Sequence, residues 1–402
     1  MAGQLITLDD ARRVVLAAVR PLPPAEVPLP EALGRILAED VASEQDLPPF
    51  DSSAMDGFAV VAGPGRELAI VGESRAGRPA ERSLDRGEAI RISTGAAVPS
   101  GANAVVPVER ATTHDARVVV PDTEPGLNVR RAGEDVRAGE AVLTAATELA
   151  PAEVAVLASL GRERVMCGAR PAVAVVVTGD ELVPPGSPLG PGQIRDSNGV
   201  ALSAQAQRAG ALVASVEHVP DERAATTTAL ERALRAADVV CVSGGVSVGE
   251  HDHVKAALAE LGAEERFWGI ALKPGKPTWF GTVGETPVFG LPGNPVSAMV
   301  TFQLLARPAL RVLSGADPTD SRVSAVLAAP VRRNPARLQA IRCRLWAADG
   351  GWQVEPTKEQ GSHVLTSMLG AGALAMIESG EGELTAGERV TAELLPSGTL
   401  SG

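Results

Sequence analysis

The segment from Val239 to Asp252 constrains the fold of this chain more than any other. Its apolar, β-branched run over residues 239–242 ends at a Ser-Gly-Gly sequence (residues 243–245), and an acidic helix start follows within a few residues. A buried strand, a glycine loop and a helix N-terminus in this order place backbone N–H groups around a concavity. The concavity suits phosphate or another oxyanion, and Asp252 at its rim indicates metal binding or acid–base chemistry beside it.

The bulk composition limits the possible partners. The chain has 402 residues, which is too many for one core and enough for two to four domains. The formal net charge of −12 argues against general nucleic-acid binding, which needs a basic face. Continuous apolar runs such as residues 172–177 are too short to cross a bilayer, and Cys167, Cys241 and Cys343 form no Cys-x-x-Cys pair. We therefore expect a cytoplasmic protein that binds neither nucleic acid nor membrane and has no disulfide framework.

Pattern changes along the chain predict several domains. Thr7 is expected to cap a helix that runs to about Arg20, and further helices are expected over residues 29–37 and 151–160. The intervening chain is rich in proline and glycine and has short alternating apolar runs, which is typical of a small β domain. The predicted division is a helical domain over residues 1–43 and 146–170, a small β domain over 44–145, an α/β domain over 171–316 and a β domain over 317–402.

Strands and helices alternate from Ala172 to Leu313. The expected strands cover residues 172–177, 212–219, 238–243, 267–270 and 287–291, and the expected helices cover 200–208, 223–236, 253–261 and 296–313. Continuous apolar strands between helices indicate a parallel sheet that is covered on both faces. Ligands of such folds bind at the carboxyl ends of the strands.

One acidic motif falls at this predicted edge, and another precedes a predicted helix. Glu181 follows the first parallel strand in Thr-Gly-Asp-Glu and would hold magnesium or act as a base, or else form a solvated turn or helix cap. Asp196 precedes a helix, where it would hydrogen-bond a heterocycle with adjacent N–H donors. The alternative is plain helix capping at that position by Asn198.

Two further motifs suit an anion. Lys273 and Lys276 each precede a proline on one turn, so their ammonium groups would bind a doubly charged oxyanion such as phosphate or molybdate, or else remain solvated. Pro295 fits the first position of a helix after Pro-Gly-Asn, which leaves free N–H groups for a second anion or forms only a cap. His251 and His253 flank Asp252, but alternating residues share neither a strand face nor a helix face, so a zinc cluster is not predicted.

These motifs, in this order, resemble the MoeA family of molybdopterin molybdenumtransferases, which is related to the E domain of gephyrin. The resemblance extends over nearly the whole chain. It rests on residues 53–60, 93–99, 131–135, 178–182, 243–249 with Asp252, 273–277, 291–297, and 361–363 with 367–368. Phe58 and Gly372 depart from the family pattern, in which tyrosine and asparagine are expected.

The resemblance implies a fold of several α/β and β domains. These are a central parallel-sheet α/β domain of the molybdopterin-binding type, a small mostly-β domain, an extended helical linker domain and a C-terminal β-barrel-like domain. It also implies a magnesium-dependent transferase that inserts molybdate into adenylylated molybdopterin and releases AMP. Two subunits would form a homodimer with a shared active cleft, in which Asp56, Thr94 and Asp135 complete the partner's site, and contact with molybdopterin adenylyltransferase is a further expectation.

The resemblance also implies roles for individual residues. Glu181 and Asp252 would hold magnesium or activate water. The expected phosphate and pterin-nucleotide contacts are Asp196, Asp221, Ser243, Gly244, Gly245, Ser247, Gly249 and Asn294. The expected molybdate pocket consists of Lys273, Lys276, Pro277, Ser297, Arg337 and Ser367.

Two alternative functions remain at this stage. Molybdopterin adenylyltransferase resembles residues 172–313 alone and needs no β domains, whereas this chain has three further segments. A non-catalytic molybdopterin-binding scaffold would not need the carboxylates and lysines that the chain retains. Tungstate has the shape and charge of molybdate, so the sequence does not separate these two oxyanions.

Overall fold

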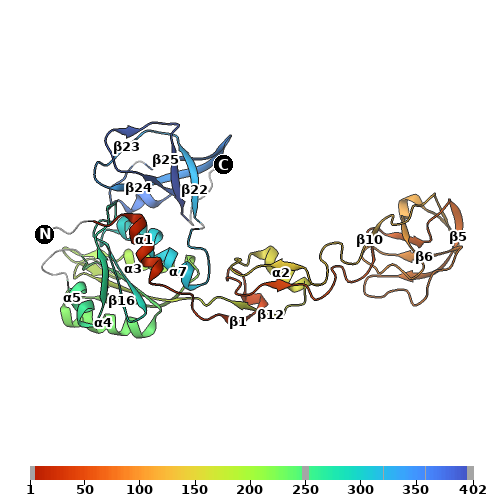
Figure 1. Cartoon of the computed structure of the whole chain (residues 1–402), viewed down its shortest axis with the longest axis horizontal. Helices are drawn as coiled ribbons and strands as arrows, with labels where there is room; N and C mark the ends of the chain where they lie inside the picture. The colour runs from red at the N-terminus through yellow and green to blue at the C-terminus, as the bar shows by residue number, and fades with distance from the viewer. Residues whose placement is uncertain (1–4, 247–252, 320, 358, 396–402) are drawn as a thin grey trace. The chain divides into compact units, whose positions relative to one another are not determined.

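The computed structural model describes residues 5–246, 253–319, 321–357 and 359–395 (Figure 1). The chain forms two compact units, which we describe separately. The larger unit consists of Met1–Ala38, Ala146–Ala150 and Arg164–Gly402, and the smaller unit consists of Glu39–Ala145 and Pro151–Glu163.

The smaller unit is built on a six-stranded sheet with the order β7-β4-β6-β5-β9-β8. These strands are β4 (Gly57–Val60), β5 (Arg66–Ser74), β6 (Glu88–Ile92), β7 (Ala104–Pro107), β8 (Thr112–His114) and β9 (Arg117–Val120). Phe58, Leu68 and Val106 are fully buried in its core. The short alternating strands predicted for this region are therefore confirmed, and helix α2 (Pro151–Ser159) begins at proline as expected.

The larger unit contains a six-stranded sheet with the order β16-β13-β17-β21-β20-β18. Its strands are β13 (Ala172–Thr178), β16 (Leu212–Val219), β17 (Val239–Ser243), β18 (Glu264–Trp268), β20 (Trp279–Val283) and β21 (Thr286–Leu291). The first four in the sheet order pair in parallel, whereas β20 and β18 pair antiparallel. The predicted parallel core is present, but the sheet as a whole is mixed. The reason is that Gly284 (φ 58°) and Glu285 join β20 directly to β21 as a hairpin, and a hairpin makes strands antiparallel.

Helices cover both faces of this sheet (Figure 1). Alternation along β13 divides its side chains between the two layers, because Val173 and Val175 face one helical layer and Ala174 and Val176 face the other. The first layer contains α1 (Leu8–Ala17), α3 (Asn198–Arg208), α6 (Pro295–Thr301) and α7 (Arg307–Leu313). The second contains α4 (Arg223–Ala236) and α5 (Val254–Glu260).

Two predicted helices differ from the structure. The helix expected over residues 29–37 is a single 3₁₀ turn, Leu29–Glu31, and the chain takes up the left-handed conformation at Gly34 (φ 71°), which a helix cannot continue through. The helix expected over 296–313 contains a π-helical segment, Phe302–Ala306, between α6 and α7. Pro308 supplies no N–H to the carbonyl of Leu304, and Arg12 Nε donates to that carbonyl instead at 3.0 Å.

The span Pro295–Leu313 is long and apolar enough to cross a membrane by composition, but 78% of its apolar window is buried within the structure. Its apolar surface is therefore already covered by protein.

The C-terminal part of the larger unit is a closed five-stranded barrel, as predicted. Its strands are β22 (Arg322–Leu327), β24 (Leu338–Ala348), β25 (Gly351–Pro356), β26 (Ala373–Ile377) and β28 (Arg389–Leu394), and the pairing of β24 with β26 closes it. Strand β19 (Leu272–Lys273), which leaves the α/β sheet region, pairs in parallel with the start of β24. This pairing attaches the barrel to the sheet domain.

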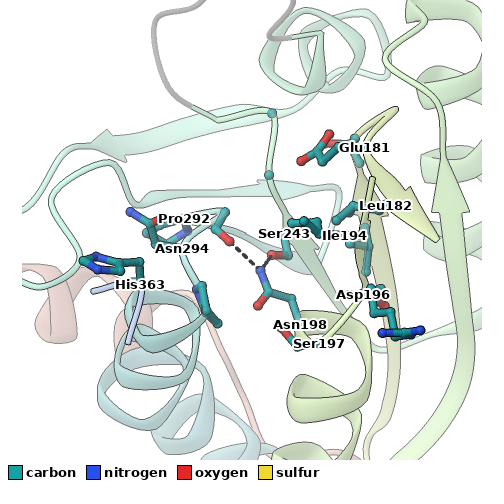
Figure 2. A pocket seen from close by; sticks show the side chains of 18 of the residues that line it. Glu181, Leu182, Ile194, Asp196, Ser197, Asn198, Ser243, Pro292, Asn294 and His363 are labelled. Atoms are coloured by element: carbon teal, nitrogen blue, oxygen red, sulfur yellow. Dashed lines mark hydrogen bonds between the residues drawn. The ribbon is translucent and has the colours of Figure 1, made fainter. Parts of the chain in front are cut away.

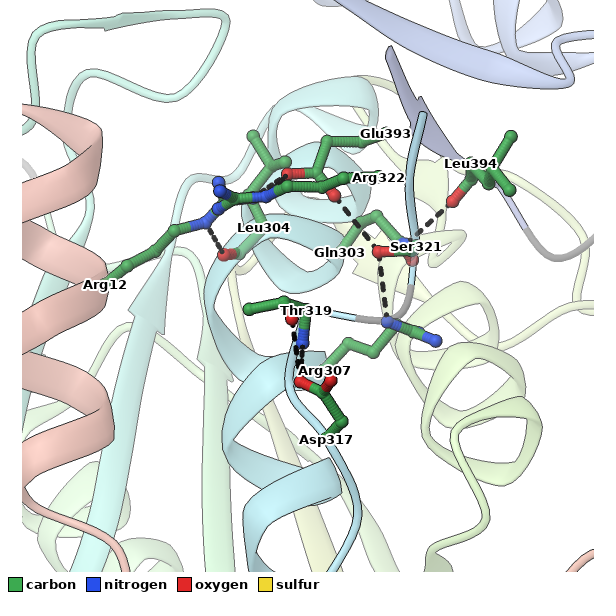
Figure 3. A network of polar contacts seen from close by, with 10 residues as sticks. All are labelled: Arg12, Gln303, Leu304, Arg307, Asp317, Thr319, Ser321, Arg322, Glu393 and Leu394. Carbon is green, nitrogen blue, oxygen red and sulfur yellow. Dashed lines mark hydrogen bonds and ion pairs between the residues drawn. The ribbon is translucent and has the colours of Figure 1, made fainter. Parts of the chain in front are cut away.

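A buried polar network makes a second attachment between the barrel and the helices (Figure 3). The carboxylate of Glu393, whose side chain is 3% exposed, forms ion pairs with Arg12 of α1 and Arg322 of β22. Ser321 Oγ also donates to it at 3.0 Å, and Gln303 of the π-helical segment donates to the carbonyl of Leu394 at 3.1 Å. Burial lowers the pKa of the Arg12 guanidinium, while Glu393 opposes that shift.

Candidate functional site

A pocket of about 820 Å³ lies where the parallel strands end (Figure 2). It is lined by residues that follow β13, β16, β17 and β21, which is the edge predicted from the sequence. Glu181, Leu182 and Ile194 lie on one side and Asn294 and His363 on the opposite side, as Figure 2 shows. The polar lining residues are Thr178, Glu181, Arg195, Asp196, Ser197, Asn198, Asp221, Ser243, Asn294 and His363.

Asn198 joins three parts of the pocket floor. It is the first residue of α3, and its Nδ2 donates to Ser243 Oγ at 2.8 Å and to the carbonyl of Gly293 at 2.7 Å (Figure 2). The side chain is 8% exposed, so these bonds form largely out of water. Asn198 therefore fixes the ends of β17 and β21 relative to α3, a role that the sequence did not indicate because capping was the expected function of this residue.

The Ser-Gly-Gly loop requires glycine at residues 244 and 245, because of the backbone conformation there and because neighbouring atoms lie too close for a side chain. Gly244 and Gly245 have φ of 89° and 64°, where side chains other than that of glycine are strained. A Cβ on Gly245 would also lie 2.5 Å from Val254 Cγ2, and one on Gly244 would lie 2.8 Å from Thr178 Oγ1. Side chains on these two residues would therefore collide with the protein interior, so the loop keeps this conformation only with glycine. Its role as an anion cradle remains a prediction.

Thr178 Oγ1 lies beneath this loop. The hydroxyl is buried and has no hydrogen-bond partner among the residues that the structure describes. A buried hydroxyl without a partner is costly in a folded protein.

Asp196 is held by two donors from different elements. Its Oδ1 accepts from the backbone N–H of Gly199 at 2.9 Å, and its Oδ2 lies 2.8 Å from His218 Nε2 on β16. Asp196, rather than Asn198, therefore caps α3. The contact with His218 was not predicted, because the sequence gives no sign that residues 196 and 218 meet.

Two further carboxylates line the pocket nearer to solvent. Glu181 is exposed and lies over Gly179, where a Cβ would be 2.6 Å from Glu181 Oε2. Asp221 is half-buried, and its backbone N–H donates to Asp180 Oδ1 at 3.1 Å. Within the described parts of the chain, no three His, Cys, Asp or Glu side chains form a group that could hold a metal ion.

The barrel contributes the wall opposite Glu181. His363 lines the pocket, Ser362 Oγ accepts from Asn294 Nδ2 at 3.2 Å, and the carbonyl of Ser362 accepts from the N–H of Val296. Residues 361–363 were part of the family resemblance, but none was a candidate site residue. Sequence reasoning therefore missed this contribution of the barrel.

Arg342 supports the loop that contains His363. The side chain is 1% exposed, and its guanidinium donates to the carbonyls of Glu359 and Gly361 and to Ser367 Oγ. Burial lowers the pKa of this guanidinium below its usual value. Ser367, a predicted molybdate contact, is buried here and donates its hydroxyl to the carbonyl of Val364 at 2.6 Å.

The other predicted molybdate residues lie around the β19 turn. Lys273 and Lys276 are exposed, and of this motif Pro277 lines the pocket. Lys273 pairs with Gln339 of β24, and Arg337 lies two residues before Gln339, just before that strand begins. Ser297 is buried in the first turn of α6 and is not among the lining residues.

Two of the three predicted residues in the smaller unit are in direct contact. The backbone N–H of Thr94 donates to Asp56 Oδ1 at 2.7 Å. Asp135 lies on a separate turn, where its N–H donates to the carbonyl of Leu47. Ser247, Gly249 and Asp252, like His251, lie outside the described residues.

The fold and pocket together define a ligand-binding α/β protein that has further β domains and a glycine-lined cleft at its strand ends. Consecutive parts of the chain match three families. Residues 6–161 match the MoeA N-terminal region (domain I and II), 174–312 a probable molybdopterin binding domain, and 324–395 the MoeA C-terminal region (domain IV).

Full-length relatives support the same assignment. The chain is 37% identical over 398 residues to the molybdopterin molybdenumtransferase of Haemophilus influenzae, covering 97% of this chain and 98% of that one. It is 39% identical over 354 residues to molybdopterin molybdenumtransferase 2 of Mycobacterium tuberculosis, covering 84% of this chain and 87% of the other. The crystal structure of the molybdopterin biosynthesis moeA protein from Pyrococcus horikoshii OT3 matches with a TM-score of 0.81 at 30% identity, covering 98% of this chain and 100% of that one. The chain therefore belongs to the MoeA family of molybdopterin molybdenumtransferases.

Proposed function

We propose that this protein is a cytoplasmic molybdopterin molybdenumtransferase that inserts molybdate into adenylylated molybdopterin and releases AMP. The observation that carries the proposal is the convergence of the strand-end motifs on one pocket. Glu181, Asp196, Asp221 and the glycine loop, which are separate in the sequence, line the same 820 Å³ space. A pocket of this volume is within the range of cofactor-sized ligands.

The pocket offers different chemistry to the parts of such a substrate. The backbone of Gly244 and Gly245 suits the phosphates, because close approach to a pyrophosphate needs positions without a side chain. The buried carboxylate of Asp196 suits the N–H donors of a pterin ring. Asp221 and Asn294, on the rim, would contact the nucleotide side.

The residues present fit magnesium in their chemistry, since Glu181 and Asp221 offer carboxylate oxygens at the pocket. We propose Glu181 and Asp252 as the magnesium ligands, with Asp252 outside the described residues. Magnesium, when bound, would offset the negative charge that develops on the phosphates. Glu181 and Asp252 would also orient the water that cleaves the pyrophosphate bond.

Molybdate would bind beside Pro277. Lys273, Lys276 and Arg337 supply positive charge around the β19 turn, and a dianion needs such charge in a chain of net charge −12. We keep Ser297 and Ser367 as proposed contributors. The barrel wall adds His363, which lines the pocket, and Ser362, whose Oγ accepts a hydrogen bond from the lining residue Asn294. Ser297 and Ser367 are not among the lining residues.

A homodimer would complete the cleft with residues of the smaller unit. Phe50 and Met55 are 46% and 39% exposed, and they flank the loop that leads to Asp56. We propose that Asp56, Thr94 and Asp135 act in the site of the partner subunit.

The test is a direct assay of turnover. The protein is incubated with adenylylated molybdopterin, molybdate and magnesium, and AMP release and protein-bound molybdenum are measured. Both should appear together and require molybdate. Formation of adenylylated molybdopterin from ATP, without molybdenum insertion, would instead identify an adenylyltransferase. Asp252→Ala should abolish AMP release while leaving the thermal unfolding temperature unchanged.

A further inference from the structure

We propose that His218 is a positioning residue that holds the Asp196 carboxylate for recognition of a pterin ring, an inference that rests on the function proposed above. His218 belongs to β16, the edge strand of the sheet, and is not itself among the residues that line the pocket. Its effect on the ligand is therefore transmitted through Asp196.

The geometry of the pair makes His218 a hydrogen-bond donor. Its Nε2 lies 2.8 Å from Asp196 Oδ2, and the Asp196 side chain is 2% exposed while that of His218 is 34% exposed. A carboxylate can only accept, so Nε2 carries the hydrogen in this contact. The second carboxylate oxygen is held from another direction by the N–H of Gly199 at the start of α3.

Two donors are needed to fix this carboxylate. The terminal torsion of an aspartate side chain is broad and soft, so a carboxylate that is bound at one oxygen can still turn about its Cβ–Cγ bond. A second donor on the other oxygen, supplied by a different element, removes that freedom. Asp196 is anchored further back as well, because its own N–H donates to the carbonyl of Val183 at 2.8 Å.

A fixed carboxylate matches one edge of a pterin. Each carboxylate oxygen has two lone-pair sites, and the bonds to Gly199 and His218 use one on each. One site on each oxygen is left for the ligand. A pterin presents a ring N–H and an exocyclic amino group side by side, which would donate in parallel to the two oxygens. The adenylyl half of the substrate would not meet this pair, so the loss of His218 should affect the two halves differently.

Substitutions at residue 218 show whether His218 acts as a hydrogen-bond donor or only fills space. In His218→Leu, Oδ2 loses its partner in a buried position, whereas in His218→Gln the amide nitrogen extends about as far from the backbone as Nε2. His218→Asn places its amide nitrogen too close to its own backbone to donate to Asp196. The matched control is His114→Leu, at an exposed histidine of the smaller unit.

The experiment measures the affinities of the full-length protein for pterin (2-amino-4-oxopteridine) and for AMP by calorimetry. We expect His218→Leu and His218→Asn to bind pterin at least about ten-fold more weakly, which corresponds to about 1.4 kcal/mol. AMP affinity should stay within about two-fold, and His218→Gln and His114→Leu should resemble the wild type. In turnover, His218→Leu should raise KM for adenylylated molybdopterin with little change in kcat.

Three results would overturn the inference. Unchanged pterin affinity in His218→Leu would remove the positioning role, and equal loss of pterin and AMP affinity would indicate general damage to the cleft. Failure of His218→Gln to restore pterin binding, while it melts like the wild type, would show that the donor is not what matters. If the wild type itself binds neither probe and releases no AMP, the proposed function fails as well, which distinguishes the two cases.

Discussion

The strand-end pocket and the Glu393 network are both rich in polar side chains, but they differ in how those groups are satisfied. In the network, Glu393 is bonded by Arg12, Arg322 and Ser321, so its charge is neutralised within the protein. In the pocket, Thr178 Oγ1 has no partner among the described residues, and Glu181 is exposed to solvent. Polar groups of the network hold the barrel to the helices. The pocket instead combines internally bonded groups such as Asp196 and Asn198 with the exposed carboxylate of Glu181, which remains available to a ligand.

This difference separates stability from function within one unit. Groups that satisfy one another contribute to the free energy of folding, and their removal leaves a buried partner without compensation. Groups that face an open pocket can be changed at little cost in stability, but the change alters what the pocket binds. Substitutions in the network should therefore lower the free energy of unfolding, whereas substitutions in the pocket should mainly change ligand binding and turnover.

The largest stability effect is expected from Glu393→Gln. The substitution leaves the buried Arg12 guanidinium without its ion-pair partner, and breaking a buried pair in this way costs about 3–5 kcal/mol. The free energy of unfolding can be followed in urea by tryptophan fluorescence, because Trp346 and Trp352 lie in barrel strands β24 and β25 and Trp268 and Trp279 lie in the α/β sheet. Arg322→Gln is the control, because that side chain is 39% exposed and its pair should contribute about 1 kcal/mol or less.

Equal losses in the free energy of unfolding for Glu393→Gln and Arg322→Gln would contradict the stabilising role given to the buried network. That role would also be contradicted if Glu393→Gln abolished AMP affinity while the urea transition stayed in place, because the network would then act on the ligand rather than on the fold.

Within this comparison, the largest effect on turnover is expected from Gly245→Ala. The added methyl group would meet Val254 and Thr178 at a residue with φ of 64°, so the loop must move out of its place in the pocket. We expect kcat/KM to fall about 100-fold, which is roughly 2.7 kcal/mol of transition-state stabilisation.

Gly293→Ala provides the matched control in the same pocket. Gly293 has no positive φ, and the nearest atom to its added Cβ is 3.8 Å away. Its kcat/KM should fall less than that of Gly245→Ala, because the added methyl group meets no atom closer than 3.8 Å and the loop keeps its conformation. Similar losses in both variants would mean that any added methyl group blocks the pocket, independently of loop conformation.

The sequence predicted the elements of the pocket better than the contacts between them. The strand that ends at Ser243 and the helices over residues 198–208 and 223–236 follow from apolar periodicity and were expected within a few residues. The convergence of Glu181, Ser243 and Asn294 followed from the rule for parallel strand ends, because all three lie at the ends of such strands or soon after them. Asp221 was expected only from the family resemblance. The proposed roles of these residues remain predictions.

Contacts between distant segments were not predictable in the same way. The pairing of His218 with Asp196 depends on the register of β16 against β13, which a single sequence does not specify. The barrel loop that brings His363 to the pocket depends on β19 pairing with β24, and a two-residue strand leaves almost no periodic signal. Strand β20 was missed because its Trp-Phe-Gly-Thr-Val sequence neither alternates nor lies between helices.

A smaller effect, confined to one ligand, is expected from Lys276→Ala. Lys276 is exposed, so its loss should leave the free energy of unfolding unchanged. Removing one ammonium group from a dianion site should weaken molybdate about ten-fold, or about 1.4 kcal/mol, measured by calorimetry at fixed ionic strength. Lys255→Ala is the control, because that lysine lies over the Trp268 ring, 4.7 Å from its centroid. Equal molybdate affinity in the two variants would remove Lys276 from the proposed site.

The smallest effect is expected at Cys241, and it tests where the pocket ends. Cys241 lies two residues before Ser243 in β17, fully buried, and burial raises the pKa of its thiol to about 12. The thiolate is the reactive form, so at pH 8 the thiol is both inaccessible and almost wholly protonated. Iodoacetamide should therefore leave Cys241 unmodified in the native protein, as measured by mass spectrometry of peptides, and should modify it after denaturation in urea. AMP should not change this result, because the ligand binds beyond the strand end. If iodoacetamide labelled Cys241 in the native protein and AMP suppressed that labelling, the pocket would extend into the sheet. The boundary between the packed interior of the sheet and the open strand edge would then lie deeper than Ser243.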